Sequence, residues 1–125
     1  MKETFIRYCQ DHLDLDSATL SPEYFYASLP HCVVDAIFSI GVRYSSTRST
    51  VIRFCEYYGF KRLRDYGTDY PTKAEQVSVQ QVLSLFSNET DDELSNNVFE
   101  NRQRTSTRNG VLKSEAVRRF LICLN

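Results

Sequence analysis

The chain has 125 residues, of which 42% are hydrophobic and 25% charged, and its formal net charge is −1. These values are typical of a soluble globular protein, and we expect a single domain over residues 1–125. The longest nearly apolar run, residues 32–42, contains an aspartate and is too short to cross a bilayer. Because the N-terminus also lacks the apolar block of a signal peptide, we expect a cytoplasmic protein that does not contact a membrane.

The four cysteines are scattered through the sequence as Cys9, Cys32, Cys55 and Cys123. A small secreted domain stabilised by disulfides would be denser in cysteine. Cys9 and His12 are one helical turn apart, but structural zinc sites usually draw on two such close ligand pairs. We therefore expect thiols that pack as small apolar side chains, with no metal and no cofactor.

The first half of the chain predicts two helices. Residues 2–13 place Phe5, Ile6, Cys9 and Leu13 on one helical face. Residues 30–43 begin with Pro30, which suits a first helical turn, after Ser28 as a candidate cap. This second helix has almost no polar face and should be the central, buried one. Gly41, near its end, predicts a close backbone approach or a break.

The middle of the chain continues this pattern. The segment 44–50 is rich in capping side chains and predicts the start of a helix that ends at residue 58. Residues 61–76 predict a short helical turn followed by an exposed loop. Residues 78–87 have apolar side chains at helical spacing and predict another helix.

The last part of the chain predicts two more helical segments. Thr90 with Glu93 matches a capping box, so a helix should begin there with an acidic first turn. Residues 111–124 predict a final amphipathic helix. Since no stretch alternates cleanly between apolar and polar residues, the sequence predicts an all-α fold, a compact bundle of about six helices.

Positive charge is concentrated in two segments, residues 43–64 and 101–120. Each segment has six Lys or Arg residues and one Glu, a net charge of +5, so the remainder of the chain carries −11. Such segregation can create a positive face that binds nucleic acid. The alternative is that these long basic side chains merely keep the outer faces of helices soluble. Charge alone favours this alternative.

The order of several small motifs resembles a known family. A buried helix reaches a serine at residues 38–39, and the next helix opens with serine and threonine at residues 45–50. Gly110 and the pair at residues 113–114, Lys and Ser, then precede another apolar helix. Over residues 30–124 this order resembles the N-terminal half of the helix-hairpin-helix (HhH-GPD) DNA glycosylase superfamily. The resemblance implies part of a helical base-excision-repair fold that contacts duplex DNA.

The chain departs from this family where the reaction takes place. In the family, a hairpin of the "LPGVG" type binds phosphate through backbone N–H groups, and a catalytic aspartate follows. Here the chain ends at Asn125, where that hairpin would begin, and Gly41 lies near the position of the family's wedge glutamine. We therefore assign no catalytic residue. The chain is either a fragment of a longer protein or a truncated relative with another role.

The predicted DNA-binding site combines polar and basic residues from both positive segments. It comprises Arg43, Ser45, Ser46, Arg48, Arg102, Arg104, Thr105, Ser106, Arg108, Asn109 and Lys113. Side chains of these types are the usual ligands of DNA phosphates. We further expect the hydroxyl and amide groups of residues 105–109 to bind backbone groups next to the last helix.

One carboxylate stands out, because Asp35 lies inside the almost entirely apolar second helix. A charge in such surroundings needs hydrogen bonds or an opposite charge. We expect the Asp35 side chain to be mostly buried and hydrogen-bonded, or paired with an arginine such as Arg43, Arg108 or Arg118.

The final helix has more apolar residues than a one-sided helix needs. They are Val111, Leu112, Val117, Phe120, Leu121, Ile122 and Leu124. Large exposed apolar patches are unusual on monomers. Either the first helix or a second copy of the chain could cover them. We predict a homodimer through residues 111–124, and the alternative function is a helical interaction or regulatory module that homo-oligomerises.

Overall fold

Helix α2 (Leu29–Phe38) is the centre of the fold, as its apolar sequence predicts. Its side chains Val33, Val34 and Phe38 are buried, and the helix packs against α3, α4 and α6. It ends earlier than predicted, at Phe38, and Gly41 follows with a left-handed φ of 69°. This conformation favours glycine, so the break predicted at Gly41 is confirmed.

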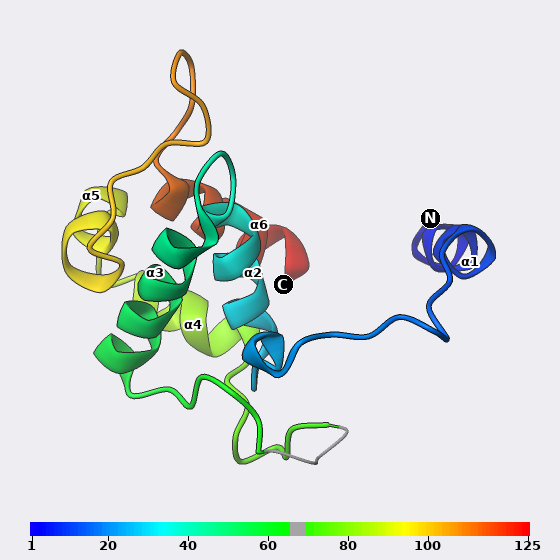
Figure 1. Cartoon of the computed structure of the whole chain (residues 1–125). Coiled ribbons are helices and arrows are strands. Elements are labelled where there is room, and N and C mark those ends of the chain that lie inside the picture. The colour runs from blue at the N-terminus through cyan, green and yellow to red at the C-terminus, as the bar shows by residue number, and fades with distance from the viewer. Residues whose placement is uncertain (66–69) are drawn as a thin grey trace.

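The structure, a computed structural model, describes residues 1–65 and 70–125. Its helices are α1 (Lys2–His12), α2, α3 (Tyr44–Tyr58), α4 (Val79–Phe86), α5 (Asp91–Glu93) and α6 (Lys113–Leu124), with the short elements η1 (Pro22–Tyr24) and η2 (Leu94–Val98). The prediction of an all-α bundle of about six helices is confirmed. Helices α2 to α6 form the bundle, and α1 lies apart from it (Figure 1). No helix in the described ranges is both long and apolar enough to cross a membrane.

Local signals position most helix ends. Ser78 caps α4 through a capping box with Gln81, and the capping box predicted for Thr90 and Glu93 is present at α5. Helix α5 continues directly into the π-helical turn η2, which the sequence did not predict. The helical turn predicted within residues 61–76 falls partly on residues 66–69, which lie outside the described ranges.

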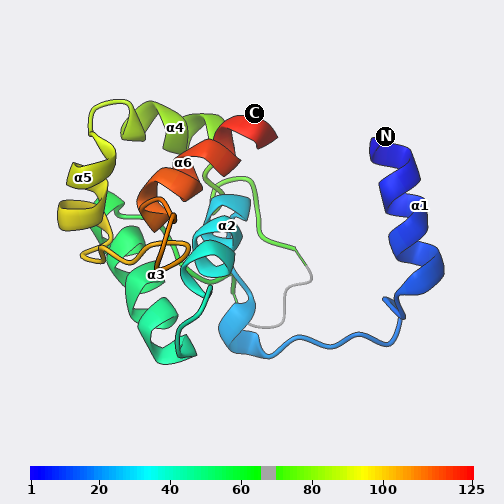
Figure 2. The same ribbon diagram turned by 90° about the horizontal axis from the view of Figure 1, so that it is seen from above.

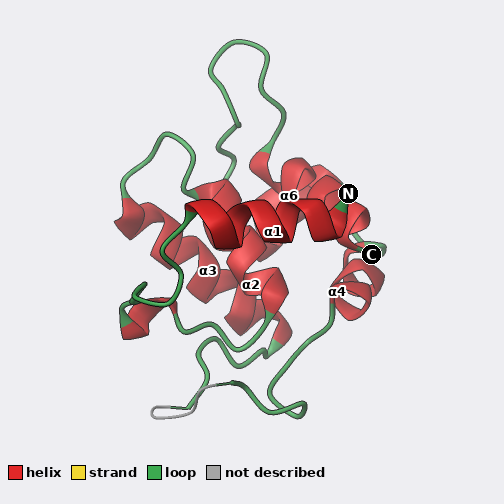
Figure 3. Cartoon of the chain, turned by 90° about the vertical axis from the view of Figure 1, so that its right-hand side faces the viewer, coloured by secondary structure: helices red, strands yellow, loops and turns green. Residues whose placement is uncertain are grey.

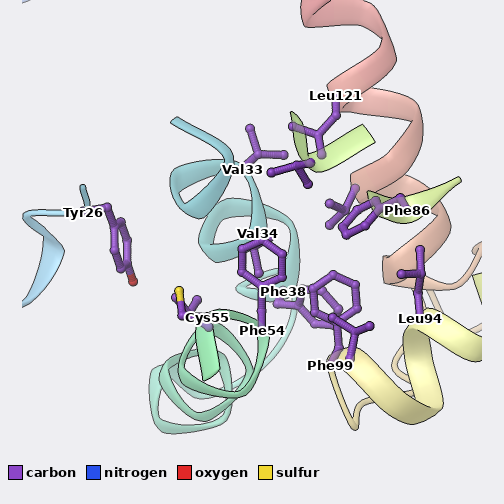
Figure 4. Packing of buried hydrophobic residues seen from close by; sticks show 14 residues of the cluster. Tyr26, Val33, Val34, Phe38, Phe54, Cys55, Phe86, Leu94, Phe99 and Leu121 are labelled. Atoms are coloured by element: carbon purple, nitrogen blue, oxygen red, sulfur yellow. The ribbon is translucent and has the colours of Figure 1, made fainter. Parts of the chain in front are cut away.

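An aromatic cluster forms the core between the helices (Figure 4). Phe54 of α3 is at its centre, stacked on Phe99 with ring centroids 5.6 Å apart. The Phe54 ring also meets Phe86 at 6.3 Å and Phe60 at 5.6 Å. Phe38 meets Phe99 from the α2 side at 4.9 Å. The core therefore joins α2, α3, α4 and the segment that follows η2.

Helix α1 contributes nothing to this core. None of its residues is buried, and a non-helical segment, residues 13–21, separates it from η1. Two perpendicular views show α1 beside the bundle, with nothing packed against it (Figure 1, Figure 2). Within this chain, α1 therefore does not cover the last helix.

Candidate functional site

The two positively charged segments meet at one end of the bundle. The side chain of Gln103 donates a hydrogen bond to Ser46 near the start of α3, with Nε2 and Oγ 3.2 Å apart. A hollow of about 400 Å³ separates residues 40–42 from residues 103–107. The loops that follow α2 and precede α6 project from this same end (Figure 1, Figure 3). The sequence predicted both segments but not Gln103, which lies 57 positions from Ser46.

The loop before α6 is closed by backbone contacts. The Thr105 N–H donates to the Val111 carbonyl at 3.0 Å, and Arg104 Nη1 donates to the Gly110 carbonyl at 2.9 Å. A Cβ atom on Gly110 would lie 2.2 Å from the Ser106 nitrogen, so only glycine fits there. Within the described residues, the hydroxyl and amide side chains of residues 105–109 form no hydrogen bonds to backbone groups. The prediction that they would hold the loop is wrong, because backbone groups and the Arg104 side chain already do so.

Three of the five predicted arginines are exposed and have no carboxylate partner among the described residues. They are Arg43 before α3 and Arg104 and Arg108 in the loop. The other two form exposed ion pairs. Arg48 pairs with Glu23, and Arg102 pairs with Asp92 at 2.9 Å and also binds Asn96. Three guanidinium groups are therefore available to an anion at this end of the bundle.

The polar residues of the site lie between these arginines. Ser45, Ser106 and Asn109 are exposed, whereas Ser46 and Thr105 are half-buried. The first turn of α3 contains no acidic residue, and no side chain caps its N-terminus. The partial positive charge of the helix dipole is therefore not neutralised at this end of α3.

Lys113 is placed differently from the other predicted residues. It is 1% exposed, and its Nζ donates to the carbonyls of Phe38 at 3.1 Å and Ile40 at 2.7 Å and to the Gln103 amide oxygen at 3.0 Å. Burial lowers the pKa of this ammonium group. All three of its protons are used, so Lys113 caps the C-terminal end of α2 and is not free to bind a phosphate.

Asp35 is hydrogen-bonded, as predicted, but its partners are the hydroxyl groups of two tyrosines and Ser39 and not an arginine. Its carboxylate accepts bonds from Tyr26 Oη at 2.5 Å and Tyr44 Oη at 2.9 Å, and the side chain is half-buried. Burial, together with these hydrogen bonds, raises the pKa of Tyr26, and burial above all raises that of Tyr44 to about 12. The arrangement joins the segment after η1 to α2 and α3, and we assign it a structural role.

His31 is a histidine whose complete burial the sequence did not predict. Its Nε2 donates to the Lys61 carbonyl at 3.0 Å, and its ring stacks near Phe60 and meets the edge of Phe54. Its Nδ1 has no hydrogen-bond partner in the described part of the chain. Burial lowers the pKa of this imidazole, so the folded protein holds the neutral form.

Stability should therefore fall as the pH falls below about 6.5, the ordinary pKa of histidine in the unfolded chain. In that range the unfolded state binds a proton that the folded state excludes. The free energy of unfolding should therefore fall by up to about 1.4 kcal/mol for each pH unit. Urea unfolding between pH 8 and 5 measures this dependence. Comparison of His31→Gln with the exposed control His12→Gln isolates the buried ring. A slope that persists in His31→Gln would contradict the assignment.

Among residues 1–65 and 70–125, no three His, Cys, Asp or Glu side chains gather closely enough to hold a metal ion. Comparison with curated proteins and with solved structures gives no match. One family model, described as "Domain of unknown function (DUF8548)", matches residues 3–125. Because the match extends over nearly the whole sequence, the chain belongs to the DUF8548 family.

Proposed function

We propose that the chain is a helical DNA-contacting domain, similar to part of the base-excision-repair glycosylases. The observation that supports this function is the meeting of two positively charged loops at one end of the bundle, joined by the bond between Gln103 and Ser46. Arg43 comes from one loop and Arg104 and Arg108 from the other, so the charges of both segments face one ligand. The proposal includes the cytoplasmic location expected from the sequence.

The chemistry of this end of the bundle suits a phosphate backbone. Guanidinium groups bind phosphate oxygens through paired N–H donors, and the N-terminus of α3 adds a positive dipole. Ser45 and Asn109 supply further exposed donors. Arg48 and Arg102 can also take part, since exposed ion pairs are worth about 1 kcal/mol or less and a phosphate can replace the carboxylate.

The proposal extends to binding and not to chemistry. Enzymes that excise a base flip it into a pocket and need an activated water or nucleophile. We assign no residue of this chain to those roles. The hollow between residues 40–42 and 103–107 is therefore described as part of a binding surface and not as a base pocket.

Replacing Arg43, Arg104 and Arg108 together with alanine should weaken duplex binding and flatten its salt dependence. Each lost phosphate contact lowers the slope of log affinity against log salt by about 0.9, so the triple variant should lose up to about three units. Fluorescence anisotropy with a short labelled duplex at several salt concentrations measures both quantities.

A matched control removes the same amount of charge elsewhere. Lys2, Arg7 and Lys73 are exposed and lie outside the proposed surface, so their triple alanine variant changes the net charge equally. This control should keep most of the affinity and slope. Equal losses in both triple variants would indicate general charge attraction. No loss in the Arg43, Arg104 and Arg108 variant would contradict the proposed surface.

One observation favours the alternative function, a helical interaction module. Both α1 and the outer side of α2 and α6 expose large apolar side chains, including Phe5 at 68% and Phe120 at 50%. A chain that associates with itself but shows no salt-dependent DNA affinity would support this alternative over DNA binding.

A further inference from the structure

Helix α1 is amphipathic but has nothing to pack against. Phe5 and Ile6 share one face with Cys9, and the two large side chains are 68% and 45% exposed. An isolated helix of 11 residues is marginal in water, because its stability depends on burying such a face. Helix α1 therefore needs a surface that its own bundle does not supply in this structure.

The bundle has a second apolar surface, formed by α2 and α6. Its exposed side chains are Leu29 and Ala36 of α2, Ile40 just after α2, and Phe120 and Leu124 of α6, and we call it the α2–α6 face. The two helices run in opposite directions, since Lys113 at the start of α6 bonds the end of α2. Val33 and Leu121 lie side by side between them (Figure 4). Phe120 and Leu124 follow Lys113 at helical spacing, on the side of α6 that meets α2, so we place the exposed side chains along one stripe over both helices.

The accessible surface of the chain is larger than expected for its size. It measures 8507 Å², whereas a compact monomer of this mass exposes about 6,900 Å². The excess of roughly 1,600 Å² is comparable to the total area buried in a standard protein interface. Docking α1 on an α2–α6 face would remove much of this excess from solvent.

The length of the linker between α1 and the bundle determines whether α1 can reach the α2–α6 face of its own chain. Residues 13–21 contain no helix and, if fully extended, could span about 30 Å, enough to bring α1 back onto its own bundle. In the single chain, α1 nevertheless stays clear of the side formed by α2 and α6 (Figure 1, Figure 2). Exposed Asp14 and Asp16 keep the linker hydrated.

We propose that α1 docks on the α2–α6 face of a second copy of the chain, and that the second copy returns the same contact. Such an exchange gives a closed two-fold dimer in which both apolar surfaces are covered. The proposal specifies which of residues 111–124 contact the second copy in the homodimer expected from the sequence. Leu112, Val117 and Leu121 belong to the core of one chain, which leaves Phe120 and Leu124 for the partner. The proposal does not depend on DNA binding.

Light scattering of the purified chain tests the dimer. We expect twice the chain mass for the unmodified protein and a decrease to 14.5 kDa for Phe120→Asp. Ile122→Asp is the matched control, because Ile122 is equally exposed but lies two residues on, around the other side of α6. On α1, Phe5→Asp should also give the monomer, and Thr4→Asp, on the polar side, should not. Circular dichroism checks that each variant is folded.

Cross-linking in the unmodified chain tests the exchange itself. Cys9 lies on the apolar face of α1, whereas Cys32 and Cys123 are exposed on α2 and α6. Cys55 is buried, and burial raises the pKa of its thiol to about 12, so it should not react. A short bismaleimide reagent should produce covalent dimers that disappear in Cys9→Ser.

Three results would overturn the proposal. The first is a monomer at tens of micromolar. The second is a dimer that persists in both Phe120→Asp and Phe5→Asp. The third is a Cys9 cross-link formed within one chain, which would show that α1 folds back onto its own bundle.

Discussion

Replacing Lys113 with methionine should lower the free energy of unfolding by about 2–4 kcal/mol. The ammonium group satisfies the carbonyls of Phe38 and Ile40 and the amide oxygen of Gln103 at the end of α2. Each buried acceptor left without a donor costs about 1–3 kcal/mol. Removing the buried charge relieves its desolvation, which offsets part of this cost. Three stranded acceptors outweigh that relief, so the net effect is destabilising.

Urea denaturation monitored by circular dichroism measures this change. Lys73→Met is the matched control, because Lys73 is exposed and the same substitution there should shift stability by about 0.5 kcal/mol or less. A loss below about 1 kcal/mol for Lys113→Met would show that water or a rearranged loop replaces the ammonium group.

Replacing Phe54 with alanine should destabilise the fold by about 3–5 kcal/mol, the range measured for buried aromatic side chains. Phe54 is fully buried and lies within ring-contact distance of His31, Tyr58, Phe60, Phe86 and Phe99. These rings come from four separate segments, so the cavity left by the substitution cannot be filled by moving one side chain. A loss of this size is a large part of the total stability of a small domain.

Tyr70→Ala controls for the general effect of removing an aromatic ring, since Tyr70 is 84% exposed. It should change the midpoint of urea unfolding little. If Phe54→Ala lost no more stability than Tyr70→Ala, the aromatic cluster would not be the centre of the core.

The parts of the fold that sequence predicted well depend on nearby residues. The capping box of Thr90 and Glu93 is contained in four residues, and the left-handed φ of Gly59 ends α3 one residue after Tyr58. The apolar sequence of α2 similarly predicts that this helix is buried. In each case the residues that determine the structure lie within one or two helical turns, so spacing alone reveals them.

Contacts between distant residues could not be predicted in this way. Ser28 precedes α2 as expected, but its hydroxyl accepts a bond from the Val77 N–H, 49 positions away, and does not cap the helix. Tyr26 pairs with Leu63 in a single β-bridge. Neither partner has a local sequence signal, because each is selected by the packing of the bundle.

The candidate site divides in the same way. Charge counts identified both positive segments, because net charge is a property of each segment alone. The sequence could not show which arginines remain free, since Arg48 finds Glu23 and Arg102 finds Asp92 only in the folded chain. The role of Lys113 was hidden for the same reason, because two of its three acceptors lie more than 70 positions earlier.

The cap on α2 also constrains when the protein can fold during its synthesis. The Phe38 carbonyl is translated 75 residues before the lysine that binds it. Ribosomes extend the chain from the N-terminus, so α2 emerges long before α6 exists. Until residue 113 is released, the central helix lacks both its cap and the apolar side chains of α6 that cover it. The nascent bundle therefore exposes its core until α6 has emerged, and until then a chaperone that binds apolar segments would find α2 accessible.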